Sequence, residues 1–220
     1  MDSSVTGRRV FAFGSGEAPA DACGEALLGG KGANLARMSR VDLPVPPGFT
    51  ITTEVCRAYL SAGRGFPDGL REEVEAALSE VAARVGKTFG AGPDPFLVSV
   101  RSGARVSMPG MMDTILNLGR NDATVEALAA RTGDARFAYD SYRRFIQMYG
   151  TVVIGVEHGL FEDLLDHARE MAGVSRDDQL DADALRALVT AYKKAISDDM
   201  DEPFPQDVHE QLWGAIAAVF

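Results

Sequence analysis

The stretch Arg101-Ser-Gly-Ala-Arg-Val-Ser-Met-Pro-Gly-Met-Met-Asp-Thr114 joins two arginines to a loop that holds two glycines and a proline. It follows an apolar run, residues 96–100, which predicts a buried strand. An arginine at a strand end suits a polyphosphate, because its guanidinium group makes bidentate, charge-assisted bonds and glycine lets backbone N–H groups approach the oxygens. The same pattern also fits a surface loop whose arginines pair with nearby carboxylates. From spacing alone, both interpretations stay open.

A second candidate anion site is the segment Gly29-Gly30-Lys31-Gly32, which opens a predicted helix over about residues 33–40. A lysine beside the unpaired N–H groups of a helix start favours a bound anion, although a solvated lysine in a helix-opening turn fits equally well. The segment is not a P-loop, because that pattern requires glycine at position 25 and serine or threonine at position 32. It is not a dinucleotide fingerprint either, since Leu35 stands where a glycine belongs.

The rest of the chain predicts an α+β protein. Strands are expected near residues 10–13, 49–52, 96–100 and 116–118, with helices over about 53–62 and 70–85. Beyond residue 121 the periodicity is helical only, with an acidic linker at 198–207 and a final helix from about 206. The last residues lie within an apolar periodic run, which predicts that the chain is a fragment ending within a domain.

Composition narrows the classes of partner. The chain has 220 residues, 46% of them hydrophobic, and a net charge of −10, which argues against nucleic acid or an anionic membrane as a partner. No apolar segment resembles a signal peptide or a membrane span, so a cytoplasmic location is expected. Cys23 and Cys56 are expected to be free thiols, with a single disulfide left open.

Four segments together resemble one family. Residues 28–35 (LGGKGANL), 43–52 (LPVPPGFTIT), the loop at 101–114 and residues 140–150 (DSYRRFIQMYG) are similar to the N-terminal nucleotide-binding domain of the pyruvate, phosphate dikinases. The first two also resemble phosphoenolpyruvate synthase and related dikinases, whereas the loop favours the pyruvate, phosphate dikinase branch. The resemblance extends from about Val10 to the last residue.

The resemblance implies the first part of an ATP-grasp-like nucleotide-binding domain. A mixed α/β subdomain, residues 1–120 with 206–220 as its closing helix, is expected to be interrupted by a helical subdomain at 121–205. Enzymes of the family convert ATP, phosphate and pyruvate into AMP, pyrophosphate and phosphoenolpyruvate through a phosphohistidine on another domain. The second ATP-grasp subdomain, the histidine domain and the pyruvate-binding barrel are missing from this chain, so it is expected to lack full activity alone.

The resemblance also implies the ligands. ATP or AMP and phosphate are expected to bind, with pyruvate reached only through the missing domains and Mg²⁺ held by ligands in the missing part; no metal ligand is expected here. The full-length relative is expected to be a homodimer. His158, His167 and His209 lack the family's phosphohistidine context and are expected at the surface; the first two are nine residues apart, which excludes one shared metal site on a helix.

Site residues follow by matching the family's motifs. Lys31 and Arg101 are expected to contact nucleotide phosphates. From the residues alone, Arg143 and Arg144 fit equally well a structural role, paired with Asp140 or other acids; the resemblance favours Arg144 for reaching the γ-phosphate and Arg143 for a structural pair. The loop from Ser107 to Thr114 is expected to close over the phosphates through backbone N–H groups, its methionines shielding the site or packing in the core; Arg105 either contacts phosphate or braces the loop. The complete set is Lys31, Arg101, Arg105, Ser107, Met108, Gly110, Met111, Met112, Thr114 and Arg144, with Arg101 and Arg144 as the catalytic candidates.

Two other functions remain possible from sequence. The chain fits a non-catalytic interaction or nucleotide-sensing module that binds through its helical part, and it fits part of a related dikinase with another phosphoryl acceptor. A pure interaction module has no use for Lys31 and Arg101 facing one pocket, so these two cations discriminate between the hypotheses.

Overall fold

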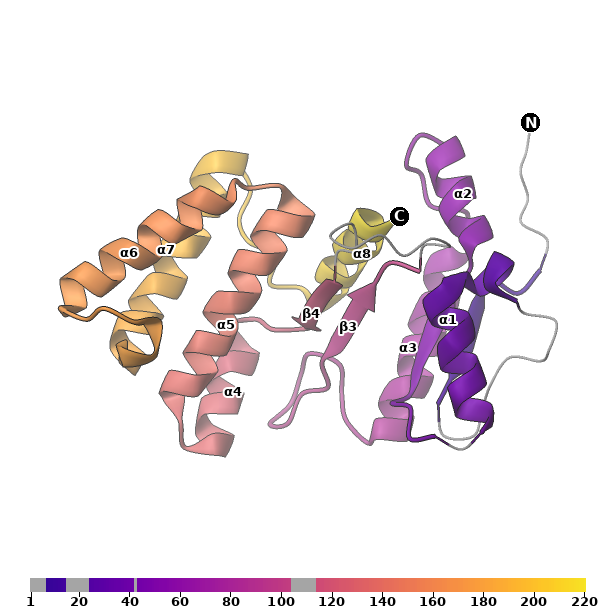
Figure 1. Ribbon diagram of the computed structural model, residues 1–220, viewed down its shortest axis with the longest axis horizontal. Coiled ribbons are helices and arrows are strands. Elements are labelled where there is room, and N and C mark those ends of the chain that lie inside the picture. The colour runs from indigo at the N-terminus through magenta and orange to yellow at the C-terminus, as the bar shows by residue number, and fades with distance from the viewer. Residues whose placement is uncertain (1–6, 15–23, 42, 104–113) are drawn as a thin grey trace. The chain divides into compact units, whose positions relative to one another are not determined.

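The computed structural model describes residues 7–14, 24–41, 43–103 and 114–220, and it shows an α+β protein that is mostly helical, with two small sheets (Figure 1). This confirms the fold class at the level of α+β. Residue contacts divide the described chain into two compact units. The first holds the described residues up to 87, residues 101–103 and residue 220; the second holds residues 88–100 and 114–219.

The first unit is built on a two-stranded antiparallel sheet covered by helices. Strand β1 (Val10–Phe13) pairs with β2 (Gly48–Ile51), with Val10 opposite Ile51. The helices of this unit are α1 (Glu25–Arg40), α2 (Thr53–Ser61) and α3 (Leu70–Val85). Helices α1 and α3 both contact the sheet.

Helix α3 follows its sequence pattern closely. Its bounds match the predicted helix at 70–85, its buried residues recur at helical spacing, and Gly86 ends it in the left-handed conformation. The buried residues are Leu70, Val74, Leu78 and Val81. Arg9, next to β1, donates through Nε to Glu73 Oε1 at 2.8 Å, which ties this helix to the strand.

The second unit contains a short sheet and five α-helices. Strands β3 (Val98–Arg101, whose last residue belongs to the first unit) and β4 (Thr114–Leu118) form the sheet. The helical elements are α4 (Asp122–Thr132), α5 (Ala135–Tyr149), the π-helical turn η1 (Gly150–Ile154), α6 (His158–Ala172), the 3₁₀ turn η2 (Asp177–Gln179), α7 (Ala182–Met200) and α8 (Val208–Val219).

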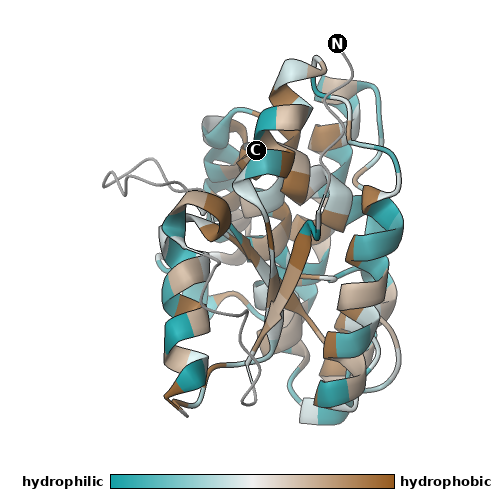
Figure 2. Ribbon diagram, turned by 90° about the vertical axis from the view of Figure 1, so that its right-hand side faces the viewer, coloured by the Kyte–Doolittle hydropathy of each residue, from teal (hydrophilic) through white to brown (hydrophobic). Residues whose placement is uncertain are grey.

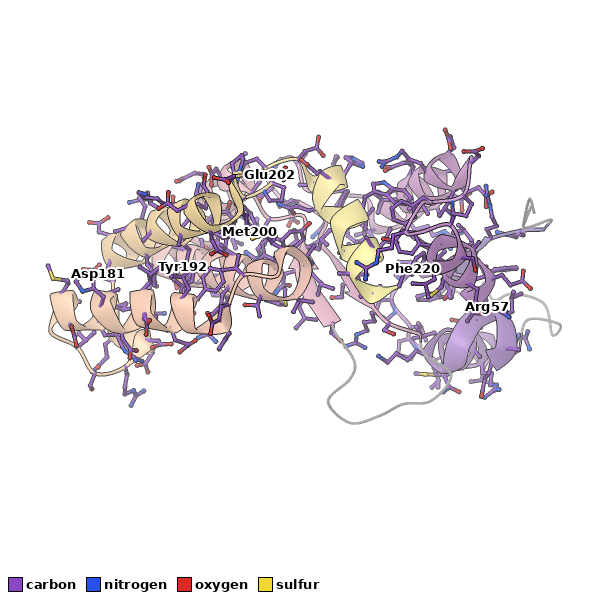
Figure 3. All side chains as sticks on the ribbon, turned by 90° about the horizontal axis from the view of Figure 1, so that it is seen from above. Arg57, Asp181, Tyr192, Met200, Glu202 and Phe220 are labelled. Carbon is purple, nitrogen blue, oxygen red and sulfur yellow. The ribbon has the colours of Figure 1, made fainter. Side chains whose placement is uncertain are left out.

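Helix α5 forms the centre of the second unit, because α4 and α7 both pack against it. The Tyr142 hydroxyl donates to Asp122 Oδ1 at 3.0 Å, and Lys193 of α7 contacts the same carboxylate at 2.8 Å. Tyr192 lies on α7, donates to the Phe161 carbonyl at 2.9 Å and packs on that ring (Figure 3). In Figure 2, hydrophilic and hydrophobic residues alternate along the helices, as expected of helices with one buried face.

Two helices of the second unit begin with side-chain caps. Asp181 caps α7 by accepting from the Ala184 N–H. Asn121 caps α4, because its side chain accepts from the Thr124 N–H while the Thr124 hydroxyl accepts from the Asn121 N–H.

Two predicted elements differ from the structure. Helix α1 begins at Glu25, well before the predicted start at residue 33, and it is interrupted at Gly29. The strand predicted as buried over residues 96–100 is β3, and its residues alternate between half-buried and exposed. A two-stranded sheet leaves much of its surface open, which explains the lower burial.

Helix α8 lies in the second unit, where it contacts β4 and η1. Its fully buried Gln211 accepts from the Gly119 N–H at 3.3 Å and donates to the carbonyls of Arg120 and Pro205, each at 2.8 Å. The subdomain boundaries expected from the family resemblance remain a prediction. Within the described residues, no helix combines the length and apolar character needed to cross a membrane.

Candidate phosphate-binding site

Gly29 breaks α1 and brings two distant segments of the first unit together. Its backbone has φ 68° and ψ 167°, a combination open essentially to glycine. A Cβ atom at this position would lie far inside van der Waals contact with the Gly103 carbonyl group. The glycine-rich segment before Lys31 and the chain just after Arg101 are therefore in direct backbone contact.

The helix that follows the break packs tightly on β2. A Cβ atom at Gly32 would lie 2.8 Å from the Thr50 side chain, so only glycine fits there without rearrangement. The Thr53 hydroxyl donates to the Ala26 carbonyl at 2.6 Å and ties α2 to the segment before the break. These contacts explain Gly29 and Gly32 by packing, and Lys31 lies in the first turn after Gly29.

Lys31 and Arg101 form a pair of neighbouring cations. Burial lowers the pKa of Lys31, and the positive charge of Arg101 lowers it further. Lys31 is half-buried, whereas Arg101 is exposed at the end of β3. Within the part of the chain that the structure describes, neither side chain has a carboxylate partner. An anion placed against both would relieve their repulsion, so the pair has the electrostatics of an anion site.

Most of the predicted phosphate loop lies outside the described residues. This applies to Arg105, Ser107, Met108, Gly110, Met111 and Met112. Thr114 is described and begins β4 in the second unit, where it is half-buried.

The two adjacent arginines of α5 have different environments. Arg143 is 4% exposed in its side chain and donates through Nη2 to Asp140 Oδ1 at 2.7 Å and to Asp177 Oδ2 at 3.4 Å. This confirms the expected structural pairing of Arg143. Arg144 is 64% exposed and donates through Nε to Asp140 Oδ2 at 3.0 Å. Arg144 belongs to the second unit, whereas Lys31 and Arg101 belong to the first.

Sequence reasoning missed two features of these units. Arg120 is 8% exposed, its Nε atom has no hydrogen-bond partner in the described part of the chain, and burial lowers its pKa. No periodic signal marks it, since it follows Gly119 in the turn after β4. The Gly29–Gly103 contact was also missed, although the paired glycines at 29 and 30 are a signal for an unusual backbone conformation.

The histidines and cysteines are the side chains to consider as metal ligands. His158, His167 and His209 are all exposed, as predicted. Cys56 is a free thiol, whereas Cys23 lies outside the described residues. Across the described ranges, no group of three His, Cys, Asp or Glu side chains is placed to hold a metal ion.

The comparisons with known proteins agree on one family. The family model described as pyruvate phosphate dikinase, AMP/ATP-binding domain, matches residues 25–65 and 63–147. The chain is 53% identical over 211 residues to a pyruvate, phosphate dikinase of Rhizobium meliloti (strain 1021), covering 96% of this chain and 24% of that relative. It is 49% identical over 216 residues to the chloroplastic pyruvate, phosphate dikinase 1 of Oryza sativa subsp. japonica, covering 98% and 23%.

A pyruvate, phosphate dikinase of Giardia intestinalis is 51% identical over 217 residues, covering 97% of this chain and 24% of the relative. The chain thus spans about a quarter of the length of these relatives. Because the family model matches more than half of its residues, the chain belongs to the pyruvate phosphate dikinase AMP/ATP-binding domain family.

Proposed function

We propose that this chain binds the phosphates of ATP and supplies one part of the nucleotide site of a pyruvate, phosphate dikinase, in an ATP-grasp-like domain. The observation that carries the proposal is the pair of cations Lys31 and Arg101, which have no acidic partner in the described chain. The backbone contact between Gly29 and Gly103 supports it, because it holds the two segments together before any ligand binds.

The chemistry of phosphoryl transfer suits these residues. Such a transfer requires mainly positioning and neutralisation of charge. The Lys31 ammonium group acts as a point charge, the Arg101 guanidinium group grips two oxygens at once, and the helix start after Gly29 adds backbone N–H groups. Arg105, the loop residues up to Thr114, and Arg144 complete the proposed set, with Arg101 and Arg144 acting on the transferred group.

Magnesium is not assigned to this chain. The described residues contain no group of three potential ligands, so they do not fit a dedicated metal site. Mg²⁺ that accompanies the nucleotide would be held by the phosphates and by ligands elsewhere. The conversion of ATP, phosphate and pyruvate into AMP, pyrophosphate and phosphoenolpyruvate is proposed only for the longer protein, as are its homodimer and the closing role of residues 206–220.

Calorimetric titration with Mg²⁺ and a non-hydrolysable ATP analogue tests the proposal. Lys31→Ala and Arg101→Ala are each expected to weaken binding by roughly 1.5–3 kcal/mol, the scale of one charge-assisted contact. Arg37→Ala is the matched control, because it removes a cation of the same helix that already pairs with Glu25 at 3.2 Å. Binding that both site variants leave intact, or no binding by a folded chain, would contradict the proposal.

A further inference from the structure

Arg144 is held by one edge of its guanidinium group and open on the other. Its Nε atom donates to Asp140 Oδ2 at 3.0 Å. Its two terminal nitrogens form no hydrogen bond or ion pair with another side chain in the described part of the protein, and the side chain is 64% exposed. The terminal nitrogens are the edge that grips two phosphate oxygens, so the contact with Asp140 leaves that edge available.

An exposed carboxylate one helical turn away would not by itself fix a long arginine, since such pairs contribute little in water. Asp140 differs because it is mostly buried, with a side-chain exposure of 17%, and both of its oxygens are engaged. While Oδ2 accepts from Arg144, Oδ1 accepts from Arg143 at 2.7 Å. The carboxylate therefore has a fixed direction in which it holds Arg144.

The residues that hold Asp140 in place are themselves connected to η2, a segment more than thirty residues further along the chain. Arg143, buried on α5, also reaches Asp177 Oδ2 in η2 at 3.4 Å. Asp177 is fixed in turn, because its Oδ1 accepts from Arg169 at 2.8 Å and its carbonyl accepts from Arg136 at 3.1 Å. Successive ion pairs thus connect η2 to the exposed arginine: Asp177 with Arg143, Arg143 with Asp140, and Asp140 with Arg144.

We propose that Asp140 is a positioning residue that holds Arg144 in the orientation for gripping a phosphate group, with Arg143 and Asp177 bracing it. This inference rests on the proposed function, in which Arg144 contacts the nucleotide phosphates. An arginine held in place before binding loses less side-chain freedom when it grips its ligand. The opposing explanation is that Asp140 acts only as a counter-charge to Arg144. In that case neutralising Asp140 would strengthen phosphate binding, because a nearby negative charge is removed, whereas a positioning role predicts weaker binding.

The test uses the whole chain and inorganic tripolyphosphate, titrated calorimetrically at one fixed salt concentration. Asp140→Asn is expected to weaken binding about five- to tenfold, the scale for immobilising one flexible side chain, although it removes a negative charge. Asp177→Asn, which does not touch Arg144, is expected to weaken it by a smaller factor. Asp183→Asn is the matched control, since it removes an exposed carboxylate paired with Arg186 at 3.0 Å, and it is expected to leave the affinity unchanged.

Asp140→Glu separates charge from geometry, because it keeps the negative charge and displaces it by one methylene group; weaker binding by this variant is expected. Equal or tighter binding by Asp140→Asn would overturn the inference. The NMR signal of the Arg144 Nε–H group without ligand provides a second readout, which Asp140→Asn is expected to shift. An unshifted signal would overturn the positioning role even if nothing binds, whereas a shifted signal with no binding by the wild-type chain would refute the proposed phosphate site alone.

Discussion

Two sets of cations in this protein have opposite environments. On α5 and its neighbours, Arg143, Arg144 and Arg169 each pair with a carboxylate of the same unit. Lys31 and Arg101 of the first unit lie close enough for the charge of Arg101 to lower the pKa of Lys31, and neither has an acidic partner among the described residues. These two like charges repel each other, whereas an arginine paired with a carboxylate is already neutralised. A bound anion is therefore expected to gain more electrostatic energy at Lys31 and Arg101 than at the paired arginines.

The backbone contact between Gly29 and Gly103 gives the largest expected effect on stability. Gly29→Ala is expected to destabilise the first unit by about 3 kcal/mol, because the new Cβ meets the Gly103 carbonyl and the backbone has a positive φ. Urea unfolding followed by circular dichroism measures the change.

Gly173→Ala is a control for the positive φ of Gly29. Its φ of 67° is similar, its ψ of 29° lies in the left-handed region, and nothing lies within 4 Å of the added atom, so about 1 kcal/mol is expected. A loss in Gly29→Ala no larger than the loss in Gly173→Ala would show that neither the contact with Gly103 nor the unusual ψ contributes.

The two adjacent arginines of α5 are expected to contribute very differently to the stability of the second unit. Arg143→Met is expected to cost about 2–3 kcal/mol, because it removes a buried donor from two carboxylates. Arg144→Met is expected to cost no more than about 0.5 kcal/mol, since its pair is exposed. Denaturant titration of both variants checks the ranking, and a larger loss for Arg144→Met would contradict the assigned roles.

Arg120 of the second unit lacks the carboxylate partner that Arg143, Arg144 and Arg169 have in the described residues. Its replacement is therefore expected to stabilise the protein, by a smaller amount than the losses above. The residue is 8% exposed, its buried Nε atom has no hydrogen-bond partner among the described residues, and burial lowers its pKa. Arg120→Met keeps the apolar stem and removes the buried charge, so a gain of about 1 kcal/mol in the free energy of unfolding is expected. A loss of stability in thermal or urea unfolding would show that an unrecognised contact satisfies this arginine.

The sequence predicts this protein best where local pattern decides the structure. The buried face of α3, its end at Gly86, the Asp181 cap and the surface histidines all follow from spacing and local chemistry. The break in α1 does not, because its cause is a backbone contact with Gly103, far along the chain. The burial of Arg120 is not marked by any local pattern either, and its carbonyl accepts from Gln211 of α8, a residue far along the chain.

The candidate site also has features that local sequence predicts and features that depend on packing. Motif matching selected Lys31, Arg101 and Arg144, and spacing alone suggested that Asp140 pairs with the arginines three and four residues later. Local spacing did not indicate that Lys31 and Arg101 lie close enough to perturb each other, because one follows the break in α1 and the other ends β3. Proximity between distant segments depends on packing, which periodicity does not encode.

The most direct test of the central claim is an NMR titration of the Lys31 ammonium group with and without a non-hydrolysable ATP analogue. In the free chain the pKa of Lys31 is expected below its ordinary value, and Arg101→Ala is expected to raise it by removing the neighbouring charge. Bound phosphates are expected to raise it in the wild-type chain, so nucleotide affinity falls as the pH rises through the titration of Lys31. A pKa that neither Arg101→Ala nor the nucleotide changes would contradict the claim that these two cations share one phosphate site.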